Sequence, residues 1–220
     1  MGIISVEQAD RLYWLGRYTE RVYTTLNIFS KSFDHLIDGM VDSYVGFCES
    51  IDIPNIYADK EDFVNSYPFD VNNTDSIISN LNRAYDNAIM LRESIGSETL
   101  AFIQLAIYDM NKAAKSKAPM IELQKVNDNL LAFYGTVDDQ IDSENVRNII
   151  KAGKRIERID MYARLGVSKE ELTREVFRMI PRVERSGLDY DERKLVNLKE
   201  LVEQDVLDYY EIVKEVESIL

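Results

Sequence analysis

The sequence predicts an all-α fold: a single domain over residues 1–220, built as an antiparallel bundle of about six to eight helices. Three observations support this prediction. Apolar residues recur at three- and four-residue steps almost throughout the chain, which is the spacing of one face of an α-helix. The 220 residues include only 4 prolines and 9 glycines, which leaves room for long helices. No two segments show the alternating pattern and the intervening turn of a strand pair.

A capping signal and an apolar stripe place the first helix. Ser5 and Gln8 have the spacing of a capping box, and the apolar stripe follows at once. The stripe predicts a helix over residues 6–40. Its continuation toward Ser50 is left open.

The rest of the chain divides into a loop and a series of further helices. Pro54 and Pro68 indicate the loop, with a short helix near residues 59–66 inside it. Ser97 and Ser168 have the character of N-caps, the second with Glu171 in capping-box spacing. The remaining helices are expected over residues 77–96, 97–115, 119–135, 143–165, 169–186 and 190–219.

Composition and charge exclude several classes of function. The net charge is −13, and such a chain repels phosphate backbones, so no nucleic-acid partner is expected. Cys48 is the only cysteine, which rules out an intrachain disulfide and a cysteine-based zinc site. No apolar run approaches the roughly 20 residues of a membrane span, and the start of the chain lacks the pattern of a secretory signal. We therefore expect a cytoplasmic protein with no membrane contact.

A short pattern of glycine and charged residues occurs twice. It reads GRYTERV at Gly16–Val22 and GKRIERI at Gly153–Ile159. Each copy holds a glycine, a basic residue one position later, a glutamate four later and an arginine five later. Both lie inside helical apolar patterns, where glycine costs roughly 1 kcal/mol relative to alanine. A helix that accepts this cost twice with the same charges is expected to hold a buried polar arrangement.

The charges of the two repeats are not satisfied within their own helices. Arg17 and Arg21 form a like-charge pair at i,i+4, which is mildly unfavourable on an isolated helix. Glu20 and Glu157 lack a basic residue four positions later, where a local ion pair would be favourable. The partners are therefore expected on another helix or in a ligand.

The middle helices offer carboxylates for this purpose. The segment Arg92–Glu98 supplies Arg92, Glu93 and Glu98. Two interpretations follow: a network of inter-helix salt bridges that fixes the packing, or a polar pocket that binds an anionic or peptide-like ligand.

No metal site is predicted, and no cofactor is identified. A di-iron bundle requires Glu-x-x-His motifs, but His35, the only histidine, has Ser32 three positions before it. Gly16 and Gly153 stand alone, so the chain has no glycine loop of the kind that binds phosphate.

Three segments resemble the bacterial alpha-E domain family, an all-helical group. ADRLYWLGRYTER at Ala9–Arg21 looks like the opening signature of that family. The segments Asp75–Glu98 and Ala152–Leu165 are similar to its central and third segments, and Lys154 stands where the family usually has arginine. The resemblance carries over residue by residue to a larger set, namely Arg17, Glu20, Arg21, Arg92, Glu93, Glu98, Glu157, Arg158 and Asp160.

The resemblance implies a function through the proteins with which the family is associated. Alpha-E proteins are associated with ATP-grasp-type ligases and transglutaminase-like proteins, which implies a role in forming or modifying peptide bonds. The leading hypothesis is an accessory domain that binds a peptide or carboxylate group beside such a ligase. The first alternative is an enzyme with Glu20 or Glu157 as general base, although neighbouring arginines lower the pKa that this role would require. The second is a purely structural helical homo-oligomer, in which every charge is paired within the protein.

Overall fold

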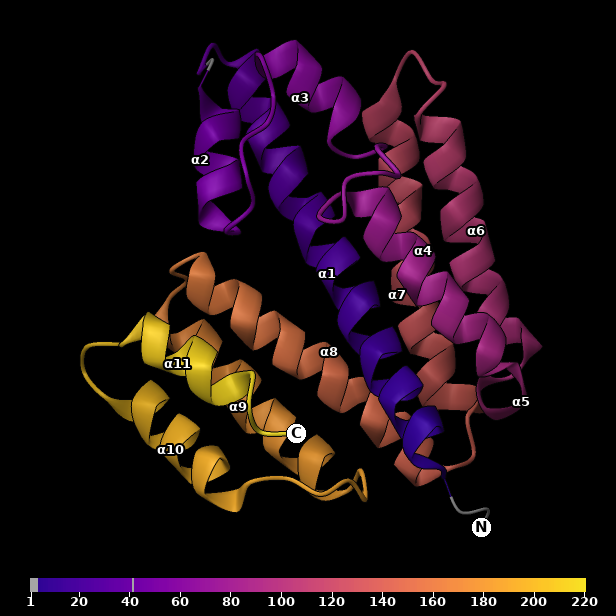
Figure 1. Cartoon of the computed structure of the whole chain (residues 1–220), viewed down its shortest axis with the longest axis vertical. Coiled ribbons are helices and arrows are strands. Elements are labelled where there is room, and N and C mark those ends of the chain that lie inside the picture. Colours follow the sequence, from indigo (N-terminus) through magenta and orange to yellow (C-terminus); the bar gives the residue numbers. More distant parts are fainter. Residues whose placement is uncertain (1–3, 41) are drawn as a thin grey trace.

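The computed structural model describes residues 4–40 and 42–220, and these residues form 11 helices and no strand (Figure 1). The predicted all-α fold is confirmed. The helices are α1 (Val6–Ile37), α2 (Ser43–Ser50), α3 (Lys60–Ser66), α4 (Ile77–Met90), α5 (Arg92–Ile95), α6 (Ser97–Ala113), α7 (Pro119–Gln140), α8 (Glu144–Arg164), α9 (Lys169–Glu184), α10 (Glu192–Glu203) and α11 (Tyr209–Val216).

The described helices outnumber the predicted six to eight because three predicted segments are interrupted. The first helix ends at Ile37, where Gly39 adopts a left-handed backbone with φ 93° and the Met40 N–H bonds to the His35 carbonyl. The segment expected over residues 77–96 breaks at Leu91, which separates α4 from the short α5. These interruptions depend on backbone turns that apolar periodicity does not report.

The C-terminal segment forms two helices where one was expected over residues 190–219. Gln204 leaves helical geometry with ψ 151°, and α10 ends before it. Asp208 then caps α11, because its side chain accepts a hydrogen bond from the Glu211 N–H at 3.0 Å. The Asp-x-x-Glu spacing at this point is a start signal that the sequence analysis missed.

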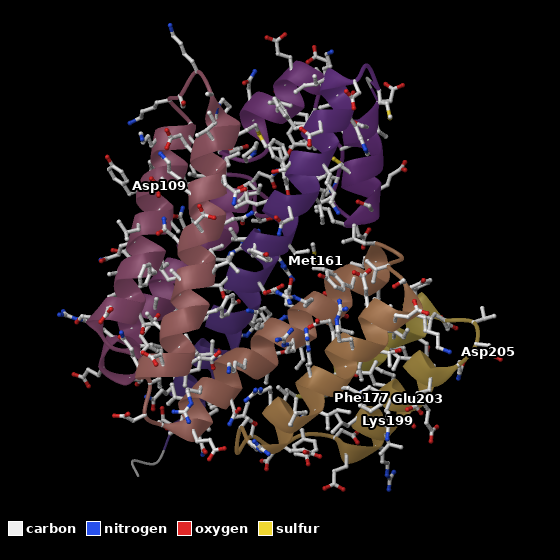
Figure 2. The ribbon with its side chains drawn as sticks, turned by 180° about the vertical axis from the view of Figure 1, so that it is seen from behind. Asp109, Met161, Phe177, Lys199, Glu203 and Asp205 are labelled. Carbon is white, nitrogen blue, oxygen red and sulfur yellow. The ribbon has the colours of Figure 1, made fainter. Side chains whose placement is uncertain are left out.

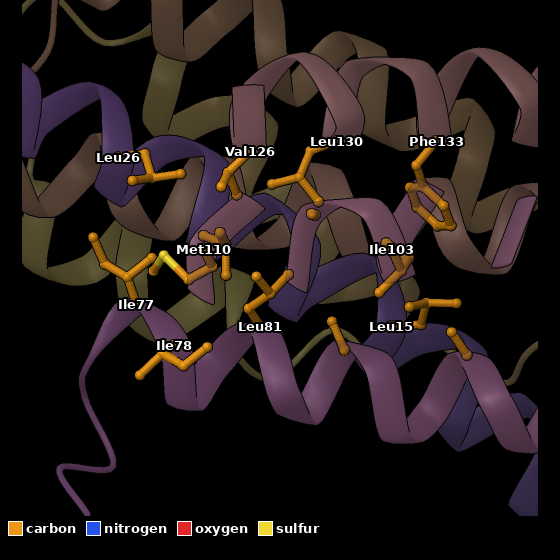
Figure 3. Close-up of a cluster of buried hydrophobic side chains, with 14 of the residues drawn as sticks. Leu15, Leu26, Ile77, Ile78, Leu81, Ile103, Met110, Val126, Leu130 and Phe133 are labelled. Carbon is orange, nitrogen blue, oxygen red and sulfur yellow. The ribbon is translucent and has the colours of Figure 1, made fainter. Parts of the chain in front are cut away.

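The helices enclose two hydrophobic cores. The first core lies among α1, α4, α6 and α7, with α2 and α3 adding aromatic side chains at one end. Figure 3 shows its centre, formed by Leu15, Leu26, Ile77, Ile78, Leu81, Ile103, Met110, Val126, Leu130 and Phe133. The second core lies between the later part of α8 and α9, α10 and α11. On the reverse side the ammonium group of Lys199 lies 5.5 Å from the centre of the exposed Phe177 ring and links α10 to α9 (Figure 2).

Helix α8 contributes to both cores and crosses α1 (Figure 1). Its first part adds Val146, Ile149 and Ile150 to the first core. Ile156 and Ile159 belong to the second core. The crossing of α1 and α8 is therefore where the two groups of helices join. Among the described helices, none has the length and apolar composition needed to cross a bilayer.

Candidate functional site

The two repeats meet each other at the crossing of α1 and α8. A Cβ atom built on Gly16 would lie 2.1 Å from the carbonyl oxygen of Ile150. A Cβ atom built on Gly153 would lie 2.2 Å from the carbonyl oxygen of Tyr13. Tyr13 precedes Gly16 by three residues, as Ile150 precedes Gly153, so the contact is reciprocal. Glycine is required at both positions because the obstructing atoms belong to the partner backbone.

Each repeat supplies the carboxylate that neutralises the arginine of the other. Arg158 Nε donates to Glu20 Oε1 at 2.5 Å, and Arg21 Nε donates to Glu157 Oε1. Arg17 Nε donates to the second oxygen of Glu157 at 2.6 Å. Both glutamates are fully buried, so these pairs lie in a medium that screens charge poorly. The repeated motif is thus one reciprocal ion-pair network, here called the crossing network.

The segment Arg92–Glu98 does not join the crossing network. Arg92, Glu93 and Glu98 are all exposed, and Arg92 Nε donates to the nearby Ser97 Oγ at 3.1 Å. The expectation that this segment supplies the carboxylates is wrong. Leu91, just before this segment, and Ile95 within it are buried, so their packing leaves the charged side chains of the segment toward solvent.

Asp160 and Glu175 extend the crossing network along α8 and onto α9. Asp160 is buried and lies 3.5 Å from Arg17 Nη2. Burial and the nearby Glu157 raise the pKa of Asp160. Glu175 is also buried and pairs with Arg155 and, at 3.8 Å, with Arg158.

Glu175 was missed in the sequence, although a signal was present. It lies three positions after Leu172 and four before Met179, both of which are buried in the second core. A charged residue at that helical position faces the interior and requires a buried partner. The helical pattern of α9 was therefore sufficient to predict Glu175 as a buried charged residue.

Lys154 departs from the reciprocal arrangement. It occupies the position equivalent to Arg17, yet it forms no ion pair with any other described residue. Its Nζ lies 3.2 Å from the centre of the Tyr134 ring. Burial, together with the positive charges of Arg158 and Arg155, lowers the pKa of Lys154 to about 7 even though Glu20 opposes the shift.

The carboxylate of Glu20, in the other repeat, shows the consequence of having a lysine at position 154. In the described part of the chain, Glu20 Oε2 is buried and has no hydrogen-bond partner. Its other oxygen accepts from Arg158 and, at 3.1 Å, from Thr24 Oγ1. Glu157, by contrast, uses both oxygens in ion pairs.

A polar cavity borders the crossing network. It has a volume of about 210 Å³ and lies where α1 and the segment after α2 meet α8 and the end of α11. We call it the junction cavity. Its charged lining residues come from both groups of helices: Arg21, Asp52, Asp75, Asp160, Arg164 and Glu217.

Arg164 joins three of the carboxylates around the junction cavity. It contacts Asp160 at 2.8 Å, Asp52 at 3.3 Å and Glu217 at 3.2 Å. Asp52 adopts a left-handed backbone with φ 56°, which is strained for a residue other than glycine. Arg21 reaches the junction cavity with its side chain 34% exposed, and its only hydrogen bond within the described residues uses Nε. The remaining N–H groups of this guanidinium are available to a ligand.

The geometry separates buried charge from accessible charge. Glu20 and Glu157 have no exposed surface and do not line the junction cavity, so neither is positioned as a general base there. Arg21 and Arg164 line the junction cavity, and so does Asp160 although its side chain is buried. Among the described residues, no three His, Cys, Asp or Glu side chains gather closely enough to hold a metal ion.

Comparison with known proteins identifies one similarity. A family model described as a predicted alpha-helical domain with a conserved ER motif matches residues 7–196. The match includes both repeats, and each repeat contains a Glu-Arg pair, Glu20-Arg21 and Glu157-Arg158. These two dipeptides supply the reciprocal ion pairs between α1 and α8. No curated protein and no solved structure matches the chain.

Proposed function

The chain belongs to the Alpha-E family, and from that membership we propose that it is an accessory domain that binds a peptide or amino acid beside a peptide-forming ligase. In this proposal the chain itself performs no chemistry. The crossing network holds α1 and α8 together, and the junction cavity holds the ligand.

The observation that carries the proposal is the mixed charge of the junction cavity. Arg21 offers free guanidinium N–H groups, which suit a carboxylate. Asp75 lines the same cavity, is exposed and forms no ion pair with another described residue. A ligand with both a carboxylate and an ammonium group would be complementary to this pair. The volume of about 210 Å³ suits an amino acid or the end of a short peptide better than a large substrate.

The crossing network supports the proposal by positioning two of the lining residues. Arg21 is held by Glu157, and Asp160 by Arg17 and Arg164. Because these contacts already fix the side chains, a ligand would bind a site that is largely formed in advance. Buried ion pairs of this kind are weak evidence for stability but well suited to fixing a geometry.

The partner is proposed on the resemblance of the three segments described above. An ATP-grasp-type ligase would supply the activation chemistry, and a transglutaminase-like protein is the second candidate. The general-base alternative has no specific support, because Glu20 and Glu157 are enclosed by arginines and do not reach the junction cavity.

Calorimetric titration with alanyl-alanine tests ligand binding. We expect saturable binding of the free dipeptide and loss of binding when its amino terminus is acetylated or its carboxyl terminus is amidated. Asp75→Asn should weaken binding of the free dipeptide, and Arg21→Lys, which keeps the charge near Glu157, should weaken it through loss of the planar guanidinium. Asp205→Asn, in the loop after α10 (Figure 2), is the matched control. Equal binding of free and doubly capped dipeptides would rule the proposal out.

Partnership is tested separately from ligand binding. Tagged chain is mixed with an ATP-grasp-type ligase or a transglutaminase-like protein from the same organism, and complex formation is followed by light scattering after gel filtration. We expect a complex that contains one copy of the partner and faster peptide formation by the ligase. A chain that forms only oligomers of itself, with no effect on the ligase, would instead support the purely structural alternative.

A further inference from the structure

A second cavity lies on the other side of the crossing, between the start of α1, the start of α8 and the loop after α9. Its volume is about 750 Å³, within the roughly 300–1,000 Å³ that is typical of small-molecule sites. We call it the Trp14 cavity, because Trp14 lines it and is the only tryptophan of the chain. Neither the repeats nor the proposed function accounts for it.

Apolar and aromatic side chains form much of its surface. Ala9, Tyr13 and Trp14 contribute from α1, Ile149 from α8 and Leu188 from the loop. The Tyr13 and Trp14 rings pack edge to face with their centres 5.8 Å apart. The Arg17 guanidinium lies 5.1 Å from the centre of the Trp14 ring and 5.8 Å from that of the Tyr13 ring, and Tyr18 stacks on Trp14, so a ligand meets only the parts of these rings that Arg17 and Tyr18 leave uncovered. Contact with these parts and with the aliphatic lining suits the apolar or aromatic body of a ligand, because it removes apolar surface from water.

The loop wall is held in place by its own hydrogen bonds. Ser186 is buried, its Oγ donates to the Val183 carbonyl at 2.7 Å and accepts from the Leu188 N–H at 3.1 Å. Gly187 adopts φ 75°, and a Cβ atom there would lie 2.9 Å from Asn145 Nδ2. The loop therefore presents Leu188 to the cavity in a fixed position.

The charges around the Trp14 cavity favour a cation over an anion. Arg17 lines the cavity, but its guanidinium already contacts Glu157 at 2.6 Å and Asp160 at 3.5 Å. Asp10 and Asp189 also line it, are exposed and form no ion pair with another described residue. The uncompensated charge at this cavity is therefore negative, which attracts cations.

We propose that the Trp14 cavity is a binding site for an organic amine, with an ammonium group carried on an apolar or aromatic body. The ammonium group lies between Asp10 and Asp189, and the body lies against Trp14, Tyr13 and Leu188. The two cavities share one lining residue, Glu217, whose carboxylate pairs with Arg164 at 3.2 Å, and none of the other residues that line the Trp14 cavity lines the junction cavity. Probes and variants of the Trp14 cavity therefore test this inference without relying on the proposed function.

Fluorescence of the single tryptophan tests the proposal without a label. The intact chain is titrated with phenethylamine, phenethyl alcohol and phenylacetate, which share an aromatic body and differ in charge. We expect a saturable change in Trp14 emission with the amine, a weaker response with the alcohol and the weakest with the acid. No saturable change with the amine, or equal affinity for all three probes, would overturn the proposal.

Two substitutions locate the ammonium group. Asp10→Asn and Asp189→Asn should each weaken amine binding by about two- to fivefold, the range of a partly exposed ion pair, and should leave alcohol binding unchanged. Asp205→Asn, in the loop after α10 and outside both cavities, is the matched control and should bind the amine as the parent does. If the double variant at Asp10 and Asp189 binds the amine as tightly as the parent, the assignment is wrong.

Discussion

At the scale of single residues, the crossing network contains one asymmetry, at Lys154. Its counterpart Arg17 makes a 2.6 Å ion pair with Glu157, whereas Lys154 leaves Glu20 Oε2 without a hydrogen-bond partner among the described residues. A buried acceptor without a donor costs free energy, because it has lost its hydrogen bonds to water. The two repeats thus share a backbone geometry but not a complete set of ion pairs.

Lys154→Arg should restore the missing contact. An arginine at this position has the planar donors that Arg17 uses on Glu157, and it can donate to Glu20 Oε2. We expect the free energy of unfolding at neutral pH to rise by about 1–2 kcal/mol, measured by urea denaturation. Lys199→Arg on the exposed face of α10 is the control and should change it by less than about 0.5 kcal/mol. A destabilised Lys154→Arg variant would show that the Tyr134 ring leaves no room for the guanidinium.

The lowered pKa of Lys154 predicts how stability depends on pH. In the folded chain the amine loses its proton near pH 7, but in the unfolded chain it does so only near 10.5. Between these values the unfolded chain binds more protons, so stability increases as pH rises, by up to about 1.4 kcal/mol per pH unit.

Urea denaturation at pH 7, 8 and 9 measures this contribution. The difference in free energy of unfolding between the parent and Lys154→Met should increase with pH in favour of the parent. This range lies below the pKa of ordinary tyrosine side chains, which limits their contribution. A difference that is constant with pH would mean that Lys154 stays protonated in the folded chain.

At the scale of helices, the glycines decide how closely α1 and α8 approach. The nearest atom to an added Cβ at Gly16 is a carbonyl oxygen of α8 at 2.1 Å, and the equivalent distance at Gly153 is 2.2 Å. A methyl group at either position must therefore push the helices apart, since a backbone atom cannot rotate away. The ion pairs of the crossing network would lengthen with the same movement.

Gly16→Ala should destabilise the chain by more than about 3 kcal/mol, because it overpacks a backbone contact and weakens the buried ion pairs. Gly135→Ala in α7 is the matched control, since a Cβ atom there meets nothing within 4 Å. The control should gain up to about 1 kcal/mol from the better helix propensity of alanine. Thermal unfolding followed by circular dichroism measures both. Similar changes in stability for the two variants would show that the effect of Gly16→Ala comes from helix propensity and not from the contact between α1 and α8.

At the scale of the whole molecule, the crossing network connects two cores. The first core holds the early part of α8 and the second holds its later part, and Glu157 lies on α8 between Ile156 and Ile159 of the second core. Its partners Arg17 and Arg21 are on α1, which belongs to the first core. One buried carboxylate therefore links both groups of helices.

Glu157→Gln should lower the free energy of unfolding by about 3–5 kcal/mol, the cost of removing one partner from a buried ion pair. The loss arises because two arginines would remain near the interior with their carboxylate gone. Glu7→Gln, which removes the exposed pair with Arg11, should cost less than about 1 kcal/mol. Chemical denaturation measures both variants, and equal effects would mean that the buried pair adds nothing beyond an ordinary surface contact.

Local patterns were sufficient to predict most of the helices but not the breaks that divide three of the predicted segments. Ser5, Ser168 and the apolar stripes placed α1 and α9 close to their observed starts, because capping and periodicity act within a few residues. The breaks at Leu91 and Gln204 were missed, since they depend on backbone turns and on Asp208 as a new cap. Nine residues were expected to form one cluster, and Arg92, Glu93 and Glu98 do not join it. The other six are found at or beside the crossing, namely Arg17, Glu20, Arg21, Glu157, Arg158 and Asp160.

By itself, the sequence determined the helical class of this protein, the two repeats and its membership in the Alpha-E family. Only the tertiary structure decided which carboxylates neutralise which arginines. The carboxylates come from the opposite repeat and not from the segment Arg92–Glu98. The reason is distance along the chain. Helix periodicity and capping relate residues up to about four positions apart, whereas Arg21 and Glu157 are 136 positions apart. Two glycines that let the backbones of α1 and α8 touch bring these side chains together.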